Sequence, residues 1–264
     1  MWKFLFNPER SPYVYTGTNP AARYFYRLSR FFPSLWKAGM PAFLTALPLA
    51  FCSNILVREY AYPGMLLVSL LLLLLFSVPF ALSMTALSYF SALAVLEREE
   101  PFLKTWIRCI RSNARQAVPI GALFSFLLSA GISAVRILLA DPGSGSLSLL
   151  IGLLLILLMD LLLWLSARLQ LLFVELTCGQ ILKNSLLLLG GHPKRFLLAG
   201  AAAGLFSAVL LLSYPVPGIF LVLAGFPGAA ALAAVSALWP PFDQTFSVSS
   251  AFAGTDAGSG DPEV

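Results

Sequence analysis

The sequence has little charge and few of the side chains that most enzymes use for chemistry. Charged residues make up 11% of the 264 residues, and the chain has 3 cysteines and 1 histidine. A soluble chain of this length carries charge on about 25% of its residues, because its surface must be covered with polar groups. The composition therefore excludes a soluble domain, a disordered chain, a collagen, a coiled coil and a small disulfide-stapled scaffold.

The cysteines and the histidine do not form a metal or redox motif. Cys52, Cys109 and Cys178 are isolated in the sequence, so we expect three reduced thiols. His192 lies in a Gly-Gly-His-Pro bend, and no Cys, Asp or Glu cluster with ligand spacing surrounds it. The G-x-S-x-G, H-E-x-x-H and P-loop patterns are also absent. The sequence predicts a protein that is not an enzyme and that has no catalytic residues, metal or cofactor.

Long apolar runs dominate the chain, in which hydrophobic residues make up 59%. A membrane-spanning helix needs about 20 apolar residues. Six runs meet this requirement, the second with a kink expected near Pro79: 38–57, 64–84, 117–135, 147–167, 196–213 and 219–238. The sequence predicts an all-α, polytopic helical membrane bundle over residues 20–245. It would follow an N-terminal segment (1–19) without a cleaved signal peptide and precede a disordered tail (246–264).

The distribution of positive charge predicts the orientation. The loops after the first, third and fifth runs have only Arg58 and Arg136 near them, and the rest of the 17 Lys and Arg residues lie on the other side. The positive-inside rule places that side, and both termini, in the cytoplasm of a bacterial inner membrane. The net charge of +5 is thus a topology signal, and we expect no nucleic-acid partner.

Several basic residues lie at helical spacing just before the apolar runs. Within 101–116, Lys104, Arg108, Arg111 and Arg115 form a stripe, with Phe102, Leu103, Trp106, Ile107 and Ile110 on the other face. Arg23, Arg27 and Arg30 repeat the spacing, and Lys183 and Asn184 begin a weaker third segment over 180–195. We therefore expect amphipathic cytoplasmic helices, and the layout allows three repeated hairpins.

These amphipathic segments have two interpretations. A basic stripe beside apolar residues is typical of a helix that lies on anionic lipid headgroups, and it also suits a partner protein. The candidate surface comprises Lys104, Trp106, Arg108, Arg111, Asn113, Arg115, Lys183 and Asn184. For Asn113 and Asn184, the alternative is a hydrogen bond that caps a helix end.

Asp160 is the one acidic residue well inside a predicted span, and Arg168 follows two helical turns later with Trp164 between them. A buried charge is costly in a membrane unless it has a partner. The pair is therefore either an ion, proton or substrate site, or an interhelical salt bridge or interfacial pair. Gly200 and Gly204 form a G-x-x-x-G motif that predicts close helix packing.

Two segments resemble the YesL-like family of bacterial integral membrane proteins. One is Ala92 to Gly121, with the acidic run Glu97-Arg98-Glu99-Glu100 followed by Phe102, Trp106, Arg111, Asn113 and Gln116. The other is Gln180-Ile181-Leu182-Lys183-Asn184-Ser185, where the family tends to carry Lys-Asn-Ala. The resemblance covers roughly residues 20–245, and it implies a protein encoded near carbohydrate import and polysaccharide degradation.

Together these patterns lead to two functional hypotheses. The first is a non-catalytic accessory or regulatory membrane component that binds a transporter subunit or another membrane protein, linked to carbohydrate uptake or sensing. The alternative is a small-solute permease that uses Asp160 and Arg168.

Overall fold

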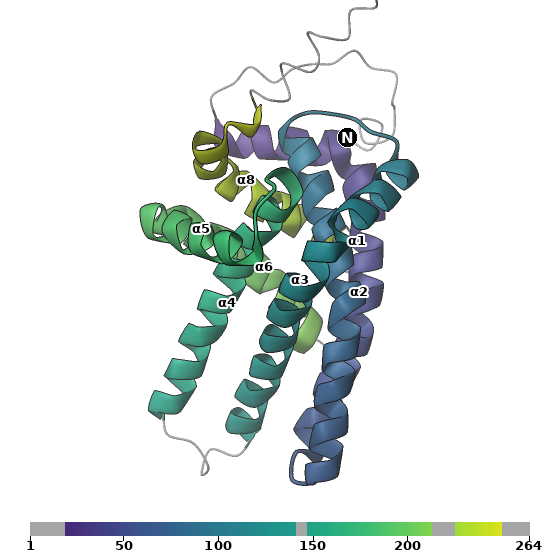
Figure 1. Ribbon diagram of the computed structural model, residues 1–264, viewed down its shortest axis with the longest axis vertical. Helices are drawn as coiled ribbons and strands as arrows, with labels where there is room; N and C mark the ends of the chain where they lie inside the picture. The colour runs from purple at the N-terminus through teal and green to yellow at the C-terminus, as the bar shows by residue number, and fades with distance from the viewer. Residues whose placement is uncertain (1–18, 141–146, 213–224, 250–264) are drawn as a thin grey trace, which may run out of the picture.

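The computed structural model describes residues 19–140, 147–212 and 225–249, and the elements within these ranges are helices (Figure 1). They are α1 (Pro20–Glu59), α2 (Pro63–Val95), α3 (Phe102–Ala140), α4 (Leu147–Phe173), α5 (Cys178–Gly191), α6 (Pro193–Leu212) and α8 (Phe226–Phe246). The prediction of an all-α bundle is confirmed. The predicted tail falls largely on residues 250–264, which lie outside the described residues.

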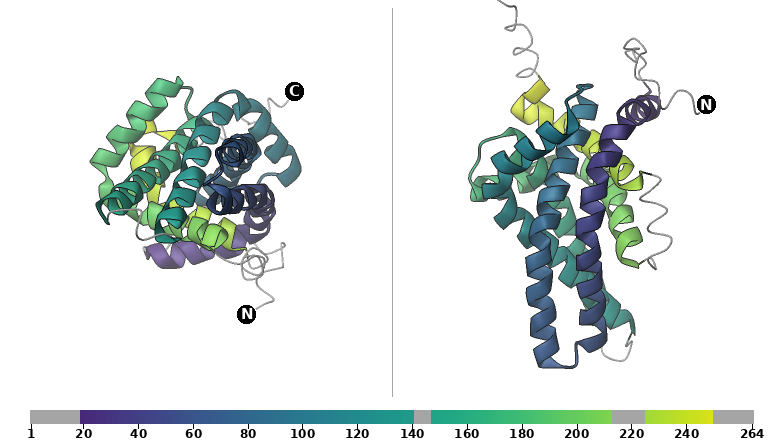
Figure 2. Two further views of the ribbon diagram at one scale, coloured as in Figure 1. Left: turned by 90° about the horizontal axis from the view of Figure 1, so that it is seen from below. Right: turned by 90° about the vertical axis from the view of Figure 1, so that its right-hand side faces the viewer.

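Four helices of the described residues, α1 to α4, are long and apolar enough to cross a membrane. They run side by side along the long axis of the molecule (Figures 1 and 2). Leucine side chains on their outer surfaces stay exposed in the isolated chain, among them Leu75 at 62% and Leu155 at 58%. Such apolar surface suits contact with lipid tails rather than with water. The protein is therefore a helical membrane protein.

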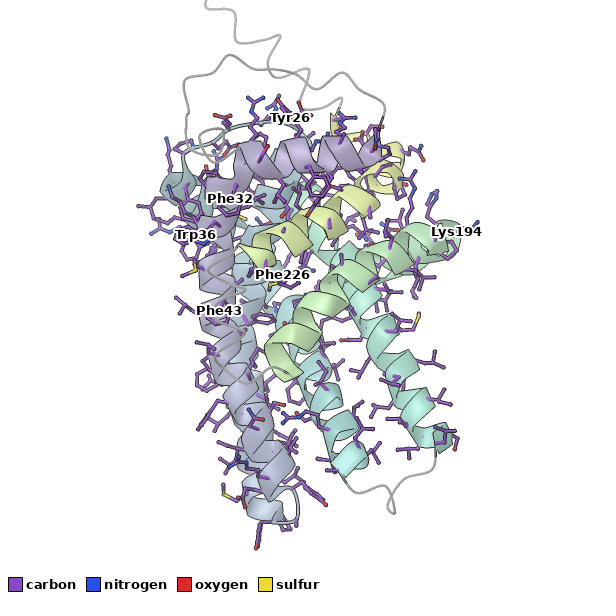
Figure 3. The ribbon with its side chains drawn as sticks, turned by 180° about the vertical axis from the view of Figure 1, so that it is seen from behind. Tyr26, Phe32, Trp36, Phe43, Lys194 and Phe226 are labelled. Carbon is purple, nitrogen blue, oxygen red and sulfur yellow. The ribbon has the colours of Figure 1, made fainter. Side chains whose placement is uncertain are left out.

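The helices α1 and α3 each join a predicted amphipathic segment to a predicted span without a break. Asn19 starts α1 by accepting a hydrogen bond at Oδ1 from the Ala21 amide (3.0 Å). The part of α1 before Pro33, the α1 arm, crosses one end of the bundle, and the helix then turns to run along it (Figure 3). A proline inside a helix removes a backbone hydrogen bond and favours such a bend.

The predicted number of six spans differs from the four found in the described residues. The fifth predicted span, 196–213, falls on α6, and the sixth, 219–238, overlaps α8 only in part and begins outside the described residues. These helices lie obliquely against the long ones, and residues 213–224 between them lie outside the described residues (Figure 3). Their amphipathic segment is a separate helix, α5, which ends at Gly191 with His192 as its C-cap, before Pro193 starts α6. The third hairpin thus differs from the first two, and an equivalence of the three stays a prediction.

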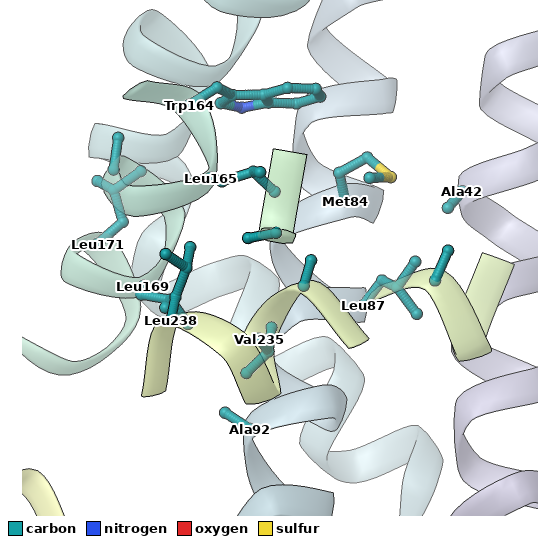
Figure 4. Packing of buried hydrophobic residues seen from close by; sticks show 14 of the residues in the cluster. Ala42, Met84, Leu87, Ala92, Trp164, Leu165, Leu169, Leu171, Val235 and Leu238 are labelled. Atoms are coloured by element: carbon teal, nitrogen blue, oxygen red, sulfur yellow. The ribbon is translucent and has the colours of Figure 1, made fainter. Parts of the chain in front are cut away.

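The core lies where α2, α4 and α8 meet near one end of the bundle (Figure 4). Leu87 of α2, Leu169 of α4 and Leu232 of α8 are at most 2% exposed. Helix α8 is buried on several sides because it packs between the α1 arm and α2, which explains its small residues. The first half of α2 and the first half of α4 have few buried residues and leave their surfaces to the bilayer.

Small residues set the closest helix contacts. A Cβ at Gly228 of α8 would lie 2.8 Å from the carbonyl oxygen of Leu35, so only glycine permits this crossing with α1. A Cβ at Gly200 of α6 would lie 2.5 Å from Leu162 Cδ2 of α4. The packing role predicted for Gly200 and Gly204 is confirmed most clearly at Gly200, since Gly204 has more room.

Candidate functional site

Most of the charged contacts lie at one end of the bundle, called the charged end, where the α1 arm meets the turn between α2 and α3. Arg27 Nε donates a hydrogen bond to Glu97 Oε1 at 3.3 Å, and Arg30 Nε donates one to Glu99 Oε1 at 3.1 Å. Arg23 lies 3.8 Å from Glu97. Arg27 is only 9% exposed, so its pair with Glu97 is the most enclosed of these contacts.

Glu97 has an unusual backbone conformation, with φ at 59° in the left-handed region. It follows the last turn of α2, where the Glu97 amide donates to the Ala94 carbonyl and the Arg98 amide to the Leu93 carbonyl. This is the Schellman motif, whose left-handed position usually holds glycine. A glutamate there has a carboxylate that reaches the α1 arm, which glycine lacks.

Glu100 links the turn to the start of α3. Its carboxylate accepts hydrogen bonds from Thr105 Oγ1 (2.8 Å), from Tyr89 (3.4 Å) and from the guanidinium of Arg108. Arg108 is 60% exposed at its side chain, so this ion pair lies at the surface. Of the predicted basic stripe on α3, Arg108 is thus engaged within the molecule.

The other three basic residues of the stripe point outward. Lys104, Arg111 and Arg115 are exposed, and none forms a hydrogen bond or ion pair with the described residues. Leu103 and Ile107 were predicted on the other face of this helix, but they are exposed, at 66% and 39%, and flank the basic stripe. These five residues are called the α3 surface. It combines positive charge with exposed apolar side chains at the charged end.

Two of the predicted surface residues on α3 turn inward. Trp106 packs against the core, and its indole Nε1 is buried without a hydrogen-bond partner in the described residues. Asn113 donates from Nδ2 to the Cys109 carbonyl at 2.9 Å, one turn back in the same helix. The alternative interpretation of Asn113, as a residue that bonds its own helix, matches this contact.

Helix α5 is amphipathic in the structure. A capping box of Thr177 and Gln180 starts it, and Ser185 on its inner face accepts a hydrogen bond from Gln170 Nε2 of α4 at 2.8 Å. Lys183 is exposed on the outside. Asn184 lines an open groove of about 250 Å³ together with His192, Thr245 and Phe246.

The intramembrane residues Asp160 and Arg168 are both buried, at 8% and 4% exposed, and lie on the same helix. They do not form an ion pair, because Asp160 Oδ2 and Arg168 Nε have no partner in the described residues. The Arg168 guanidinium instead lies over the Trp164 ring, 4.4 Å from its centroid. The described residues show no interhelical salt bridge for either residue, and the choice between a functional site and an interfacial pair stays a prediction.

Sequence reasoning did not foresee the use of Glu97 and Glu99 as partners of the α1 arm, nor Gln170 as the link to α5. The available signal was the acidic run at 97–100, since a cluster of carboxylates at a helix end suits nearby arginines. Comparison with family models, with curated proteins and with solved structures finds no match.

Proposed function

We propose that this protein is a non-catalytic accessory component of the membrane that binds a partner protein through the α3 surface. The observation that carries the proposal is the exposure of Lys104, Arg111 and Arg115 without acidic partners in the described residues. Exposed Leu103 and Ile107 lie beside them. A surface that combines apolar anchors and arginines is typical of the centre of a protein interface.

The position of this surface supports a membrane-bound partner. The α3 surface lies on the same helix as a membrane span, so a partner that reaches it is held at the same membrane face. The excess of positive charge at this end favours a cytoplasmic location under the positive-inside rule, in a bacterial inner membrane. The resemblance to YesL-like proteins points to a subunit of a carbohydrate import system as the partner.

Anionic lipid headgroups could occupy the α3 surface instead of a protein, since each basic side chain near a bilayer binds them with about 1 kcal/mol. The two occupants differ in what they require. Lipid binding depends on the number of charges, whereas a protein partner depends on their arrangement around Leu103 and Ile107. A variant that alters Leu103 and Ile107 but keeps every charge therefore distinguishes a protein partner from anionic lipid.

The test is recovery of a stoichiometric partner from native membranes in mild detergent, with the full chain as bait. Replacing Lys104, Arg111 and Arg115 with Gln should abolish recovery. Leu103→Ser with Ile107→Ser, which keeps every charge, should weaken it at least about tenfold. The matched control neutralises the same number of exposed basic residues elsewhere, at Lys37, Lys194 and Arg195, and should leave recovery unchanged.

Two results would contradict the proposal. One is that the wild-type chain recovers no stoichiometric partner. The other is that both sets of neutralised residues reduce recovery equally, because binding would then follow total charge and indicate lipid. Solute uptake by proteoliposomes that contain the chain alone would instead support the permease alternative.

A further inference from the structure

The structure contains a buried cation, Arg168, that forms no ion pair with the described residues. Arg168 is 4% exposed and lies in α4 at a depth where the surrounding side chains are apolar. A guanidinium has five N–H donors and stays charged. Its Nε has no partner, and no acidic side chain of the described residues lies within 4.0 Å of it. A charge in this position costs several kcal/mol unless something compensates it.

Asp160 does not supply that compensation. It lies eight residues before Arg168 on the same helix, which corresponds to a rise of about 12 Å. The Trp164 ring lies under the guanidinium at 4.4 Å and comes between the two residues along the helix. Trp164 offers its ring face to the cation, a contact that stabilises the charge only in part.

Arg168 faces a cavity that other helices complete. The cavity lies between α2, α4, α6 and α8, and it measures about 20 Å³, space for about one water-sized group. Its walls are mainly apolar, with Met84 and Ser88 from α2 and Ala231 and Ala234 from α8. The Ser88 hydroxyl already donates to the Met84 carbonyl, at 2.9 Å. Among the described residues that line the cavity, Arg168 is thus the one charged side chain.

We propose that this cavity receives one oxygen of an oxyanion group, a carboxylate or phosphate carried by a soluble solute or by a lipid headgroup. The guanidinium N–H groups form charge-assisted hydrogen bonds with such an oxygen. The opposite wall consists largely of small alanine side chains from α6 and α8, and Figure 4 shows Leu169 of α4 beside Leu238 of α8. This site is separate from the α3 surface and does not depend on it.

The experiment measures thermal unfolding of the purified full chain in detergent at constant ionic strength. Three probes are titrated: sodium acetate in place of sodium chloride, inorganic phosphate, and phosphatidylglycerol against phosphatidylcholine. The wild type should show a saturable rise in Tm of about 4 °C at ten times the Kd. A rise with acetate or phosphate assigns a soluble ligand, and a rise with phosphatidylglycerol alone assigns a lipid headgroup.

Three variants connect the rise to the cavity. Arg168→Gln should abolish it, and Arg168→Lys, which keeps the charge without the fork, should weaken binding about tenfold. Ala231→Leu fills the cavity from α8 and leaves the guanidinium in place. If Arg168→Gln does not fold, this variant shows whether the rise in Tm depends on the cavity. A rise that survives Ala231→Leu or Arg168→Gln would overturn the proposal, as would the absence of a saturable rise with all three probes.

Discussion

The α1 arm and the start of α3 have basic residues at the same helical spacing, yet the structure uses them differently. Arg27 of the α1 arm is 9% exposed and pairs with Glu97, whereas Lys104, Arg111 and Arg115 of α3 are exposed and unpaired within the described residues. The difference comes from the acidic turn, which lies against α1. One stripe therefore stabilises the fold, and the other is free to bind something else.

The largest expected loss of stability comes from removing the ion pair between Arg27 and Glu97. Arg27→Gln should lower the free energy of unfolding by about 2 kcal/mol, because Glu97 then keeps only the distant Arg23. Arg23→Gln is the control, and since its side chain is 53% exposed it should cost at most about 0.5 kcal/mol. Thermal unfolding in detergent measures both. Equal losses would show that enclosure does not distinguish the two arginines.

The second prediction separates the two properties of Glu97. Glu97→Ala and Glu97→Gly both remove the carboxylate, but the glycine variant also relieves the left-handed backbone at φ 59°. Glu97→Gly should therefore be more stable than Glu97→Ala by about 1 kcal/mol, while both are less stable than the wild type. Chemical denaturation of the three chains tests this order. An alanine variant at least as stable as the glycine variant would contradict the Schellman motif.

A smaller effect is expected at the exposed pair on α3. Arg108→Gln should cost about 0.5 kcal/mol, because its side chain is 60% exposed and solvent screens the pair with Glu100. Raising the salt concentration should reduce this cost and leave that of Arg27→Gln largely unchanged. Unfolding measured at low and high salt tests the contrast. A stability loss that depends more on salt for Arg27→Gln than for Arg108→Gln would contradict this prediction.

The smallest effect on stability belongs to the α3 surface. Replacing Lys104, Arg111 and Arg115 with Gln should change the free energy of unfolding by less than about 0.5 kcal/mol, since these side chains touch no described partner. The thermal unfolding curve should match that of the wild type. A loss as large as that of Arg27→Gln would mean that the α3 stripe also holds the fold together.

The sequence allowed the helical class and the spans within α1 to α4 to be predicted, because long apolar runs have few alternatives. It also showed both basic stripes. It did not show which stripe is internal, since Arg27 and Glu97 are 70 positions apart and only the fold brings them together. Trp106 was misplaced for a similar reason, because the helical period gives faces but not which neighbour covers each face.

The predicted membrane orientation and the functional hypotheses stay predictions. For Asp160 and Arg168, the spacing along one helix suggested a shared site, but side-chain direction decides contact. Long side chains in a helix lean toward its N-terminus, and Trp164 occupies the space into which Arg168 leans. The burial of Arg168, whose Nε has no partner in the described residues, follows from the placement of α6 and α8 around it.

Helix α3 is continuous from Phe102 to Ala140, with Pro119 as its one internal proline. A helix of this length spans about 58 Å, so its exposed basic segment and its membrane segment belong to one continuous helix. A tilt or rotation of the α3 surface would therefore also move the transmembrane part of α3, and Pro119 is the position at which the helix would bend.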